Sequence, residues 1–365
     1  MRDLFRSSPS TSPRFALPVI AAFAAVYVIW GSTYLAIVFA IETMPPFLAI
    51  GSRFLVAGLI LYGWMLLRGK GRLGLREAWN AALVGALTAG AGTGTVAWAE
   101  QHIASGLVAL LVTVVPIWMV LLDWKWLDGG APSRHVIIGL ILGFLGIGFL
   151  VGPDLVVAGL DVDVIAALVV LAGSVSWSVG SLYGKRISMP GNAFTSSAVQ
   201  MLGGGVALLI VGALMGELPA FSIAAITPAS FAGWAYLIVF GSIVAFSAYV
   251  WLMANVSPKQ VSSYAYVNPV VAVFLGWLLA GEHVDIRTIV AAVVLVSAVA
   301  LVLRYGSGKS SEATVKTASS LGIETNHSAL EPAPSELRTD GLVDAESPNG
   351  KARTSEPVAA ECEAA

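Results

Sequence analysis

Ten apolar runs follow one another between Phe15 and Arg304, separated by short polar breaks. A helix that crosses a bilayer needs about 20 mostly apolar residues, and each run approaches that length. The composition agrees, because 57% hydrophobic residues, 12% charged residues and a mean hydropathy of +0.83 do not fit a soluble domain with a solvated surface. The sequence therefore predicts an all-α integral membrane protein with spans at residues 16–39, 47–67, 79–99, 106–123, 136–153, 164–184, 194–215, 231–253, 260–280 and 287–304.

The second half of the chain repeats the first. A shift of 153 residues, without a gap, places Trp251, Pro269, Trp277 and Arg287 on Trp98, Pro116, Trp124 and Arg134. Each copy, 16–153 and 164–304, holds five spans, so the second copy must enter the membrane from the opposite side. We therefore expect two inverted five-helix repeats, an architecture that places a binding site near the middle of the membrane between the halves.

Basic residues lie almost entirely on one side of the predicted topology. Alternate loops hold fourteen Lys and Arg residues on the side of the N-terminus and Arg287 alone on the other side. Because Lys and Arg are enriched in cytoplasmic loops, both termini are predicted to be cytoplasmic. Residues 1–15 form the N-terminal cytoplasmic segment, and residues 305–365, which are rich in Ser, Glu, Pro and Ala, are expected to be a disordered acidic tail.

The sequence lacks the residue patterns of several kinds of functional site. The single cysteine, Cys362, makes no internal disulfide, and the four histidines lie near helix ends or in the tail, so we expect no metal site and no cofactor. The GAGTG string at 90–94 falls inside a predicted span and lacks the strand-turn-helix context of a phosphate-binding loop. No span groups two residues of catalytic type, so neither an enzyme nor a nucleic-acid-binding protein is expected.

Two prolines stand at equivalent places near the bilayer centre. Pro116 and Pro269 lie about ten residues into their spans, and each removes a helix hydrogen bond to the carbonyl four residues earlier. A freed carbonyl in hydrocarbon must be satisfied by protein or by water in a cavity. A packing kink is the ordinary interpretation, but the symmetric placement favours hinges beside a central cavity.

Aromatic and polar residues follow helical spacing within several spans. In the ninth span, Tyr266 and Asn268 lie on two polar edges that are not expected to face lipid. Aromatic belts at the membrane interfaces are the alternative interpretation for such residues. We expect six of them to line the central site: Trp30, Tyr34, Trp98, Trp177, Tyr266 and Asn268.

Arg53 is the one full charge well inside an apolar run. It lies about 9 Å from the outer end of its span, and a charge at such a depth indicates a functional site. Its counterpart by inversion is near Gln200, a further candidate for contact with the bound molecule. Glu100 is the natural partner of Arg53, and the repeat position of Glu100 is Met253. Two interpretations stay open: a structural pair of Arg53 with Glu100, and direct contact of Arg53 with a bound carboxylate.

Glycines in the fifth span mark a close helix contact. Gly139 and Gly143, and Gly148 and Gly152, have four-residue spacing, which suits tight packing in membranes. The fifth and tenth spans are therefore expected to act as scaffold or as the surface of a homodimer.

The two halves resemble the EamA domain of the drug/metabolite transporter superfamily. The resemblance rests on the ten-span duplication, on WGSTYLAI at 30–37 and on VNPVVAVFLGWLLAGE at 267–282. It covers roughly residues 16–304 and excludes the tail. The first unit departs from the pattern, because LLDWKWLDGG follows Pro116 and Asp128 stands roughly where Glu282 would project.

The resemblance implies a multi-pass secondary transporter of the bacterial inner membrane that exports amino acids or other small metabolites by alternating access. A multidrug, sugar or nucleotide-sugar carrier of the same fold is the alternative, and a receptor or channel is a more distant one. Export needs an energy source, for which a proton or an exchanged counter-solute is the candidate and Glu100 the one candidate coupling carboxylate. The solute, the direction, the coupling ion and the oligomeric state are open at this point.

Overall fold

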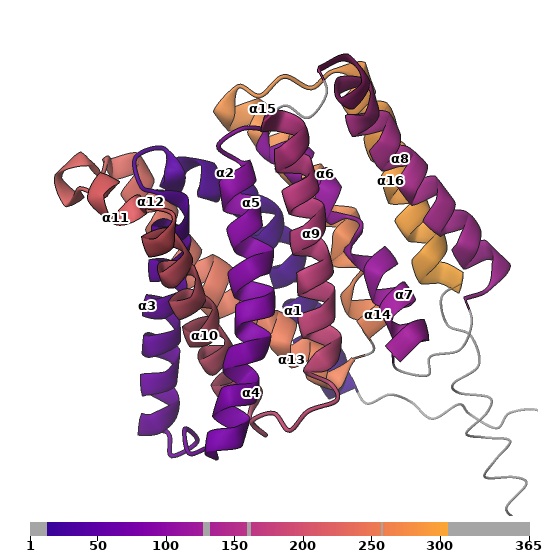
Figure 1. The fold of residues 1–365 in the computed structure, drawn as a ribbon. Coiled ribbons are helices and arrows are strands. Elements are labelled where there is room, and N and C mark those ends of the chain that lie inside the picture. Colours follow the sequence, from indigo (N-terminus) through magenta and orange to yellow (C-terminus); the bar gives the residue numbers. More distant parts are fainter. Residues whose placement is uncertain (1–12, 127–131, 159–161, 257, 306–365) are drawn as a thin grey trace, which may run out of the picture. The chain divides into compact units, whose positions relative to one another are not determined.

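Helices account for all the regular structure in the described part of the chain. The computed structural model describes residues 13–126, 132–158, 162–256 and 258–305 (Figure 1). The predictions for the first residues of the N-terminal segment, for Asp128 and for nearly all of the tail fall outside these ranges. All described residues belong to one compact unit.

Seven helical stretches within the described ranges are long and apolar enough to cross a membrane. They are Leu17–Ile41, Pro46–Leu67, Leu75–Ala99, Ser105–Trp126, Asp163–Tyr183, Ala193–Leu214 and Pro228–Asn255. Shorter apolar helices lie where the other three spans are expected, at Arg134–Gly146, Val267–Ala280 and Ile286–Leu301. The prediction of an all-α membrane protein is confirmed in this form.

The bounds of the individual elements show where these stretches change their winding. In chain order they are α1 Pro13–Ala24, η1 Ala25–Ile29, α2 Trp30–Ile41, α3 Pro46–Leu67, α4 Leu75–Gly85, η2 Ala86–Gly92, α5 Thr93–Ala99, α6 Ser105–Val112, α7 Val115–Trp126, α8 Arg134–Ala158, α9 Val162–Tyr183, α10 Ala193–Leu214, α11 Glu217–Ala220, η3 Ile223–Ala225, α12 Pro228–Tyr236, η4 Leu237–Phe246, α13 Ser247–Asn255, α14 Pro258–Val261, α15 Tyr264–Ala280 and α16 Ile286–Tyr305.

Three stretches contain a wider, π-helical segment. These segments are η1, η2 and η4, and the last two lie in the third and eighth stretches, at corresponding places of the two halves. π-Helical segments inside α-helices are rare and frequently mark functional sites. The fourth stretch is broken instead, because α6 ends at Val112 and α7 begins at Val115.

The helices pack in pairs that join distant parts of the sequence. α3 lies along α10, and α8 lies along α16 (Figure 1). α10 also packs against α4 and η2 through glycines, because a Cβ at Gly85 would overlap the backbone of Gln200, and a Cβ at Gly204 would stand 2.8 Å from the Gly85 carbonyl oxygen. Such close backbone contact is typical of membrane helices.

Apolar side chains both fill the interior and cover the outside of the bundle. Ile50, Leu110 and Phe246 are among the fully buried ones, whereas Phe144, Phe274 and Trp277 are exposed. Large exposed apolar surfaces on a soluble monomer would be a liability, but a bilayer is as apolar as these side chains. The outer faces therefore suit contact with lipid tails.

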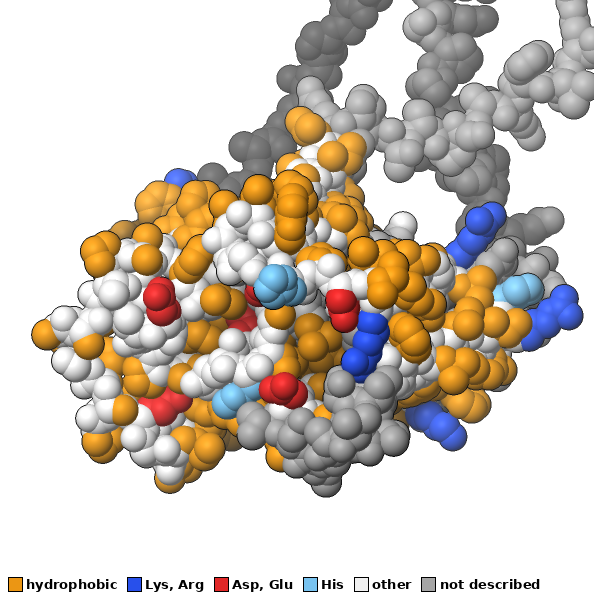
Figure 2. Space-filling model, turned by 90° about the horizontal axis from the view of Figure 1, so that it is seen from above, with side chains coloured by type: hydrophobic (Ala, Val, Ile, Leu, Met, Phe, Trp, Pro, Cys, Tyr) orange, Lys and Arg blue, Asp and Glu red, His pale blue; other side chains and the backbone are white. Residues whose placement is uncertain are grey.

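The two ends of the bundle differ in charge. We call the end at which α3 passes into α4, at the bottom of Figure 1, the N-terminal end, and the opposite end, which carries α11, the far end. Figure 2 looks onto the far end, where acidic and histidine side chains gather. Its loops hold Glu42, His102, Glu217, Glu282, His283 and Asp285, whereas those of the N-terminal end hold Arg68, Lys70, Arg72, Arg76, Lys185 and Arg186.

Carboxylates cap helix N-termini at the far end. Glu282 accepts hydrogen bonds from the Ser105 N–H (2.8 Å), the Ser105 hydroxyl (2.6 Å) and the Gly106 N–H (3.2 Å), which ties the end of α15 to the start of α6. Glu217 accepts in the same way from the Phe47 and Leu48 N–H groups at the start of α3. The first N–H groups of a helix have no partner within the helix, and a negative charge beside them is favourable.

Candidate functional site

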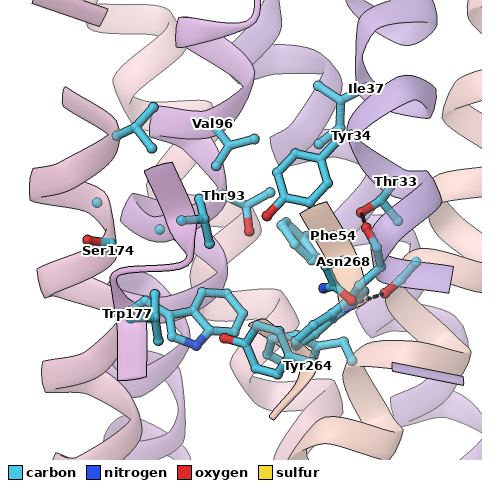
Figure 3. A pocket seen from close by; sticks show the side chains of 18 of the residues that line it. Thr33, Tyr34, Ile37, Phe54, Thr93, Val96, Ser174, Trp177, Tyr264 and Asn268 are labelled. Carbon is cyan, nitrogen blue, oxygen red and sulfur yellow. Dashed lines mark hydrogen bonds between the residues drawn. The ribbon is translucent and has the colours of Figure 1, made fainter. Parts of the chain in front are cut away.

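A cavity of about 80 Å³ lies in the middle of the bundle. Side chains from both halves of the chain form its wall, and Figure 3 shows Tyr34, Thr93 and Trp177 around it together with Tyr264 and Asn268. A cavity needs about 10–15 Å³ of this kind of volume to hold one water molecule. In this conformation the cavity therefore has room for a few waters or for a small solute.

Four aromatic rings pack together on the side of the cavity that faces the N-terminal end. The ring of Trp30 lies 5.5 Å from that of Trp177, 5.0 Å from that of Tyr249 and 5.3 Å from that of Tyr264. We call Trp30, Trp177, Tyr249 and Tyr264 the aromatic layer. The Trp30 indole N–H also donates to the Gly241 carbonyl at 3.3 Å, which fixes that ring against η4.

Tyr249 joins the aromatic layer to the sixth membrane stretch. Its hydroxyl accepts from the Trp177 indole N–H at 3.1 Å and lies 2.9 Å from the Ser181 hydroxyl. Ser181 donates its own hydrogen to the Trp177 carbonyl at 2.7 Å. The tyrosine is therefore the donor to Ser181, and its hydroxyl has both a donor and an acceptor role filled.

Arg53 contributes a buried cation to the cavity wall. Only 4% of its surface is exposed, and its guanidinium lies 4.4 Å from the ring centroid of Phe54. A Cβ at Gly241 would stand 3.8 Å from the Arg53 Nη1 atom, which places the guanidinium beside η4. The Nε and Nη1 atoms have no hydrogen-bond acceptor among the described residues, although a buried charge normally has one.

Glu100 contributes a buried acid next to the same cavity. It follows α5 directly, and its N–H donates to the Val96 carbonyl at 2.9 Å, so Glu100 lies one helical turn beyond a residue of the cavity wall. Glu100 is 8% exposed, and neither oxygen of its carboxyl group has a hydrogen-bond donor within the described part of the chain. The sequence-based prediction of a direct Arg53–Glu100 pair finds no hydrogen bond to support it.

Asn268 adds a neutral polar group to the wall. Its side chain is buried and lines the cavity, and its Oδ1 atom has no donor among the residues that the structure describes. Buried polar atoms without partners cost free energy unless water or a ligand satisfies them. Arg53 and Asn268 thus leave hydrogen-bonding capacity for a molecule in the cavity.

A second, larger cavity lies toward the N-terminal end. It measures about 680 Å³, and its wall includes Thr88, Ser181, Lys185, Gln200 and Tyr249. Tyr249 packs against four rings of the central cavity's wall and also lines the second cavity. The aromatic layer is therefore the partition between the two cavities.

The structure sorts the residues predicted from the sequence into three groups. Trp30, Tyr34, Arg53, Trp177 and Asn268 all line the central cavity. Trp98 and Gln200 are not in its wall: the Trp98 ring packs against His102 with centroids 4.8 Å apart, and Gln200 lines the second cavity and donates to the Ser196 hydroxyl at 3.0 Å. The side chain of Tyr266 lies outside the described residues.

The two prolines, predicted as symmetric hinges, occupy different settings. Pro116 follows the break at Thr113–Val114 and lies in the first turn of α7, where a proline is tolerated. In the ninth stretch the break falls earlier, at Ser262–Ser263, and Pro269 lies inside α15. Pro269 borders an apolar groove between α15 and α16 rather than the central cavity.

Sequence reasoning missed Tyr249, which holds the aromatic layer together. The available signal was a tyrosine deep in a predicted span, because a buried tyrosine hydroxyl needs a hydrogen-bond partner. Phe54 and Phe246, which also line the cavity, gave no signal that separates them from ordinary core residues.

The sequence is similar to those of known membrane transporters. The sequence pattern of the EamA-like transporter family matches the chain twice, at residues 17–152 and 164–304. The uncharacterized inner membrane transporter YedA of Escherichia coli (strain K12) is 40% identical over 294 residues, which cover 79% of this chain and 92% of that protein. The protein PecM of Dickeya dadantii (strain 3937) is 28% identical over 280 residues, 75% of this chain and 88% of PecM.

One solved crystal structure shares the fold. It superposes with a TM-score of 0.56 at 18% sequence identity and covers 78% of this chain and 96% of its own. At this identity the likeness concerns the fold alone.

Proposed function

Because the chain belongs to the EamA-like transporter family, we propose that it is a secondary transporter that exports small metabolites such as amino acids across the inner membrane of a bacterium. Transport across a membrane follows from the family, and the multi-pass helical bundle suits it. The central cavity would hold the solute, and alternating access would expose it to one side at a time.

The packing of the helices supports the proposal of two inverted repeats. We number the ten stretches in chain order, so that stretches one to five of the first half correspond to stretches six to ten of the second. If the halves are related by symmetry, a contact between the first and ninth stretches requires an equivalent contact between the sixth and fourth. Both pairings occur, as α2 with α15 and as α9 with α7. A second equivalent pair of contacts is also present. The third stretch packs against the sixth, as η2 with α9, and the eighth packs against the first, as α12 with α2. A site between two such repeats fits a carrier that rocks about its centre.

The charge difference between the ends supports a cytoplasmic location of both termini. Lys and Arg gather at the N-terminal end, whereas the far end is acidic (Figure 2). The single cysteine, Cys362, offers a direct test. A maleimide that does not cross membranes should label it only after intact cells are permeabilised, whereas a far-end cysteine, Ala225→Cys in a Cys362→Ser chain, should react in intact cells. Labelling of Cys362 in intact cells contradicts this orientation.

The observation that carries the solute proposal is Arg53. A guanidinium that is 4% exposed, with two nitrogen atoms lacking acceptors in the wall of a cavity, is prepared for a carboxylate, which guanidinium groups bind in a two-pronged geometry. The rings of the aromatic layer offer apolar contact for the remainder of a small solute. A solute that is only a cation would be repelled by Arg53, which argues against cationic drugs.

Counterflow in proteoliposomes tests the proposal. The purified protein is reconstituted, the vesicles are loaded with unlabelled amino acid, and the entry of labelled amino acids from a panel is measured. We expect saturable counterflow of at least one amino acid and its loss in Arg53→Ala. Arg68→Ala is the matched control, because Arg68 caps the other end of the same helix and is exposed.

The outcomes separate the alternatives. No counterflow of any amino acid by folded protein overturns the amino-acid proposal, and the same vesicles are then tested with sugars, nucleotide sugars and drugs. Counterflow that survives Arg53→Ala unchanged overturns the role of Arg53. Flux that never runs uphill against a gradient indicates a channel.

A further inference from the structure

Exposed cations gather in the connection between α3 and α4, at the bottom of Figure 1. Residues 64–79 hold four of them, all exposed: Arg68, Lys70, Arg72 and Arg76. The one acid in this segment, Glu77, accepts a hydrogen bond from the Gly74 N–H at 3.3 Å and so caps α4. Within the described residues no salt bridge joins any of the four cations to an acid. Their charge is therefore available to a partner outside the chain.

Large apolar side chains are exposed beside these cations. Trp64 and Leu67, in the last turn of α3, are 52% and 85% exposed, and Leu75 and Trp79, in the first turns of α4, are 88% and 70% exposed. One membrane stretch ends at Leu67 and the next begins at Leu75, so these side chains lie where the hydrocarbon meets the lipid head groups. Tryptophan is enriched at this level of a bilayer. The segment therefore suits contact with lipid rather than with water alone.

Hydrogen bonds fix the backbone that carries the cations. Gly69 follows α3 in the left-handed conformation, with a φ of 69°, which glycine adopts without strain. The Lys70 carbonyl accepts from the Thr195 hydroxyl at the start of α10 (2.9 Å), and the Gly71 carbonyl accepts from the Tyr62 hydroxyl on α3 (3.1 Å). The loop is therefore a preformed surface, and the binding of a partner does not have to order its backbone.

Arg68 is prepared for a phosphate group. Its guanidinium lies 4.6 Å from the ring centroid of Trp64, and this cation–π contact holds the group beside the indole. A guanidinium binds phosphate oxygens through two N–H groups. A soluble acidic protein would neutralise the four cations but would leave Leu67 and Leu75 without an apolar partner, whereas a phospholipid supplies both a phosphate and acyl chains.

We propose that residues 64–79 form a binding surface for an anionic phospholipid in the leaflet at the N-terminal end. The four cations bind the head-group phosphate, while the exposed tryptophan and leucine side chains contact the glycerol region and the upper acyl chains. We call these cations and exposed apolar side chains the lipid patch. Each cation near an anionic membrane surface strengthens binding roughly fivefold. The lipid patch therefore prefers phosphatidylglycerol, which has a net negative charge, to phosphatidylcholine, which has none.

Lipid selectivity is the first test of the proposal. The purified full chain is titrated in detergent with phosphatidylglycerol or with phosphatidylcholine of the same acyl chains, and bound lipid is counted by native mass spectrometry. We expect phosphatidylglycerol to bind at least about tenfold more tightly. Phosphatidylglycerol should also raise the melting temperature, and this rise should shrink when sodium chloride screens the charges. Equal binding of the two lipids overturns the proposal.

Two double variants locate the binding surface. Arg72→Gln/Arg76→Gln removes two cations of the lipid patch, and Lys185→Gln/Arg186→Gln removes two exposed cations from another loop at the same end. We expect the first variant to bind phosphatidylglycerol at least about tenfold more weakly and the second to change its binding by less than about threefold. An equal loss in both variants overturns the proposal, because any basic loop at this end would then serve.

Two exposed tryptophans test the apolar part of the lipid patch. Trp79 is 70% exposed, and Trp277 on α15, outside the patch, is 57% exposed. Trp79→Ala should weaken the binding of both lipids by a similar factor, whereas Trp277→Ala should change neither. If Trp79→Ala binds both lipids like the wild type, the surface recognises charge alone, and the lipid proposal fails in favour of a soluble acidic partner.

The binding of lipid is measured without transport, so the two proposals fail independently. An absence of amino-acid counterflow does not affect the lipid patch, and an absence of lipid selectivity does not affect the transport proposal. A thermal melt without added lipid identifies misfolded variants. Should Arg72→Gln/Arg76→Gln melt early, the comparison of the two lipids and its salt dependence in the wild type decide.

Discussion

The central cavity has a buried charge, Arg53, in its wall, whereas the charged side chain in the wall of the second cavity, Lys185, is exposed. Arg53 is the eighth residue of α3, counted from Pro46, and Gln200 is the eighth residue of α10, counted from Ala193. By the separate 153-residue shift, the repeat position of Glu100 is Met253, which lines the second cavity. One architecture thus has a cavity with a buried charge in the middle of the bundle and, toward the N-terminal end, a cavity whose buried polar side chains are neutral.

This difference indicates that the two cavities have different roles in transport. A full charge in a membrane interior is costly and is retained where it binds something, whereas neutral amides and hydroxyls let a polar solute pass without holding it. The Gln200 side-chain amide already donates a hydrogen bond to the Ser196 hydroxyl, so part of its hydrogen-bonding capacity is occupied. We infer that selection of the solute occurs at Arg53 and that the larger cavity serves as a passage.

The largest effect should come from replacing the buried charge of the central cavity by its neutral counterpart. Arg53→Gln places the second-half residue in the first half, and we expect counterflow to fall roughly 10- to 100-fold, because a hydrogen bond to a charged group contributes about 1.5–3 kcal/mol. Gln200→Ala should change counterflow by less than about threefold. If the two variants lose equal activity, the division between the cavities is wrong.

The helix packing beside the second cavity gives the next effect. A Cβ at Gly85 meets the backbone of Gln200, which cannot yield, so Gly85→Ala should destabilise the bundle by about 1–3 kcal/mol. Gly148 on α8 has no atom within 4 Å of the corresponding position, so Gly148→Ala should be neutral or stabilise by up to about 1 kcal/mol. Melting in detergent, followed by size-exclusion chromatography, measures both; equal melting temperatures contradict the contact.

The partition between the two cavities should respond more weakly. Tyr249→Phe leaves the Trp177 indole N–H without its acceptor, but water in the second cavity can replace the hydroxyl, so we expect a cost of about 1 kcal/mol. Because the phenyl ring still packs in the aromatic layer, the KM for the solute should stay the same. Tyr183→Phe, at the exposed end of α9, is the control. A large rise in KM for Tyr249→Phe would place Tyr249 in the solute site.

The smallest effect concerns the far-end caps and appears only in acid. Hydrogen bonds from the Thr288 hydroxyl and N–H lower the pKa of the Asp285 carboxyl below its usual value. A lowered pKa in the folded state means that this carboxylate stabilises the fold above its unfolded pKa of about 3.9 and loses that contribution as the pH falls through the folded value. Asp285→Asn keeps a helix cap but cannot titrate.

The melting temperature of Asp285→Asn should therefore match that of the wild type at pH 7 and fall less steeply below about pH 4. A parallel decline of both proteins with pH would show that Asp285 does not contribute to the acid sensitivity of the far end.

The sequence alone determined the membrane class and the internal duplication. It also determined the charge difference between the ends and the unusual depth of Arg53. These features depend on composition, on run length and on residue order, none of which needs a neighbour in space. The prediction that Trp30, Tyr34, Trp177 and Asn268 belong to one site depended on the repeat, and all four line one cavity.

Only the tertiary structure decided which face of each helix meets the cavity. The π-helical segments η2 and η4 change the winding of the third and eighth stretches, and one additional residue turns the following face by about 100°. Beyond η2, Trp98, which was predicted from its repeat position, packs on His102 instead of lining the cavity, and beyond η4, Tyr249 joins the aromatic layer. Whether Arg53 and Glu100 pair was likewise set by how α3 and α5 pack, because two charges on different helices have no fixed distance until the helices meet.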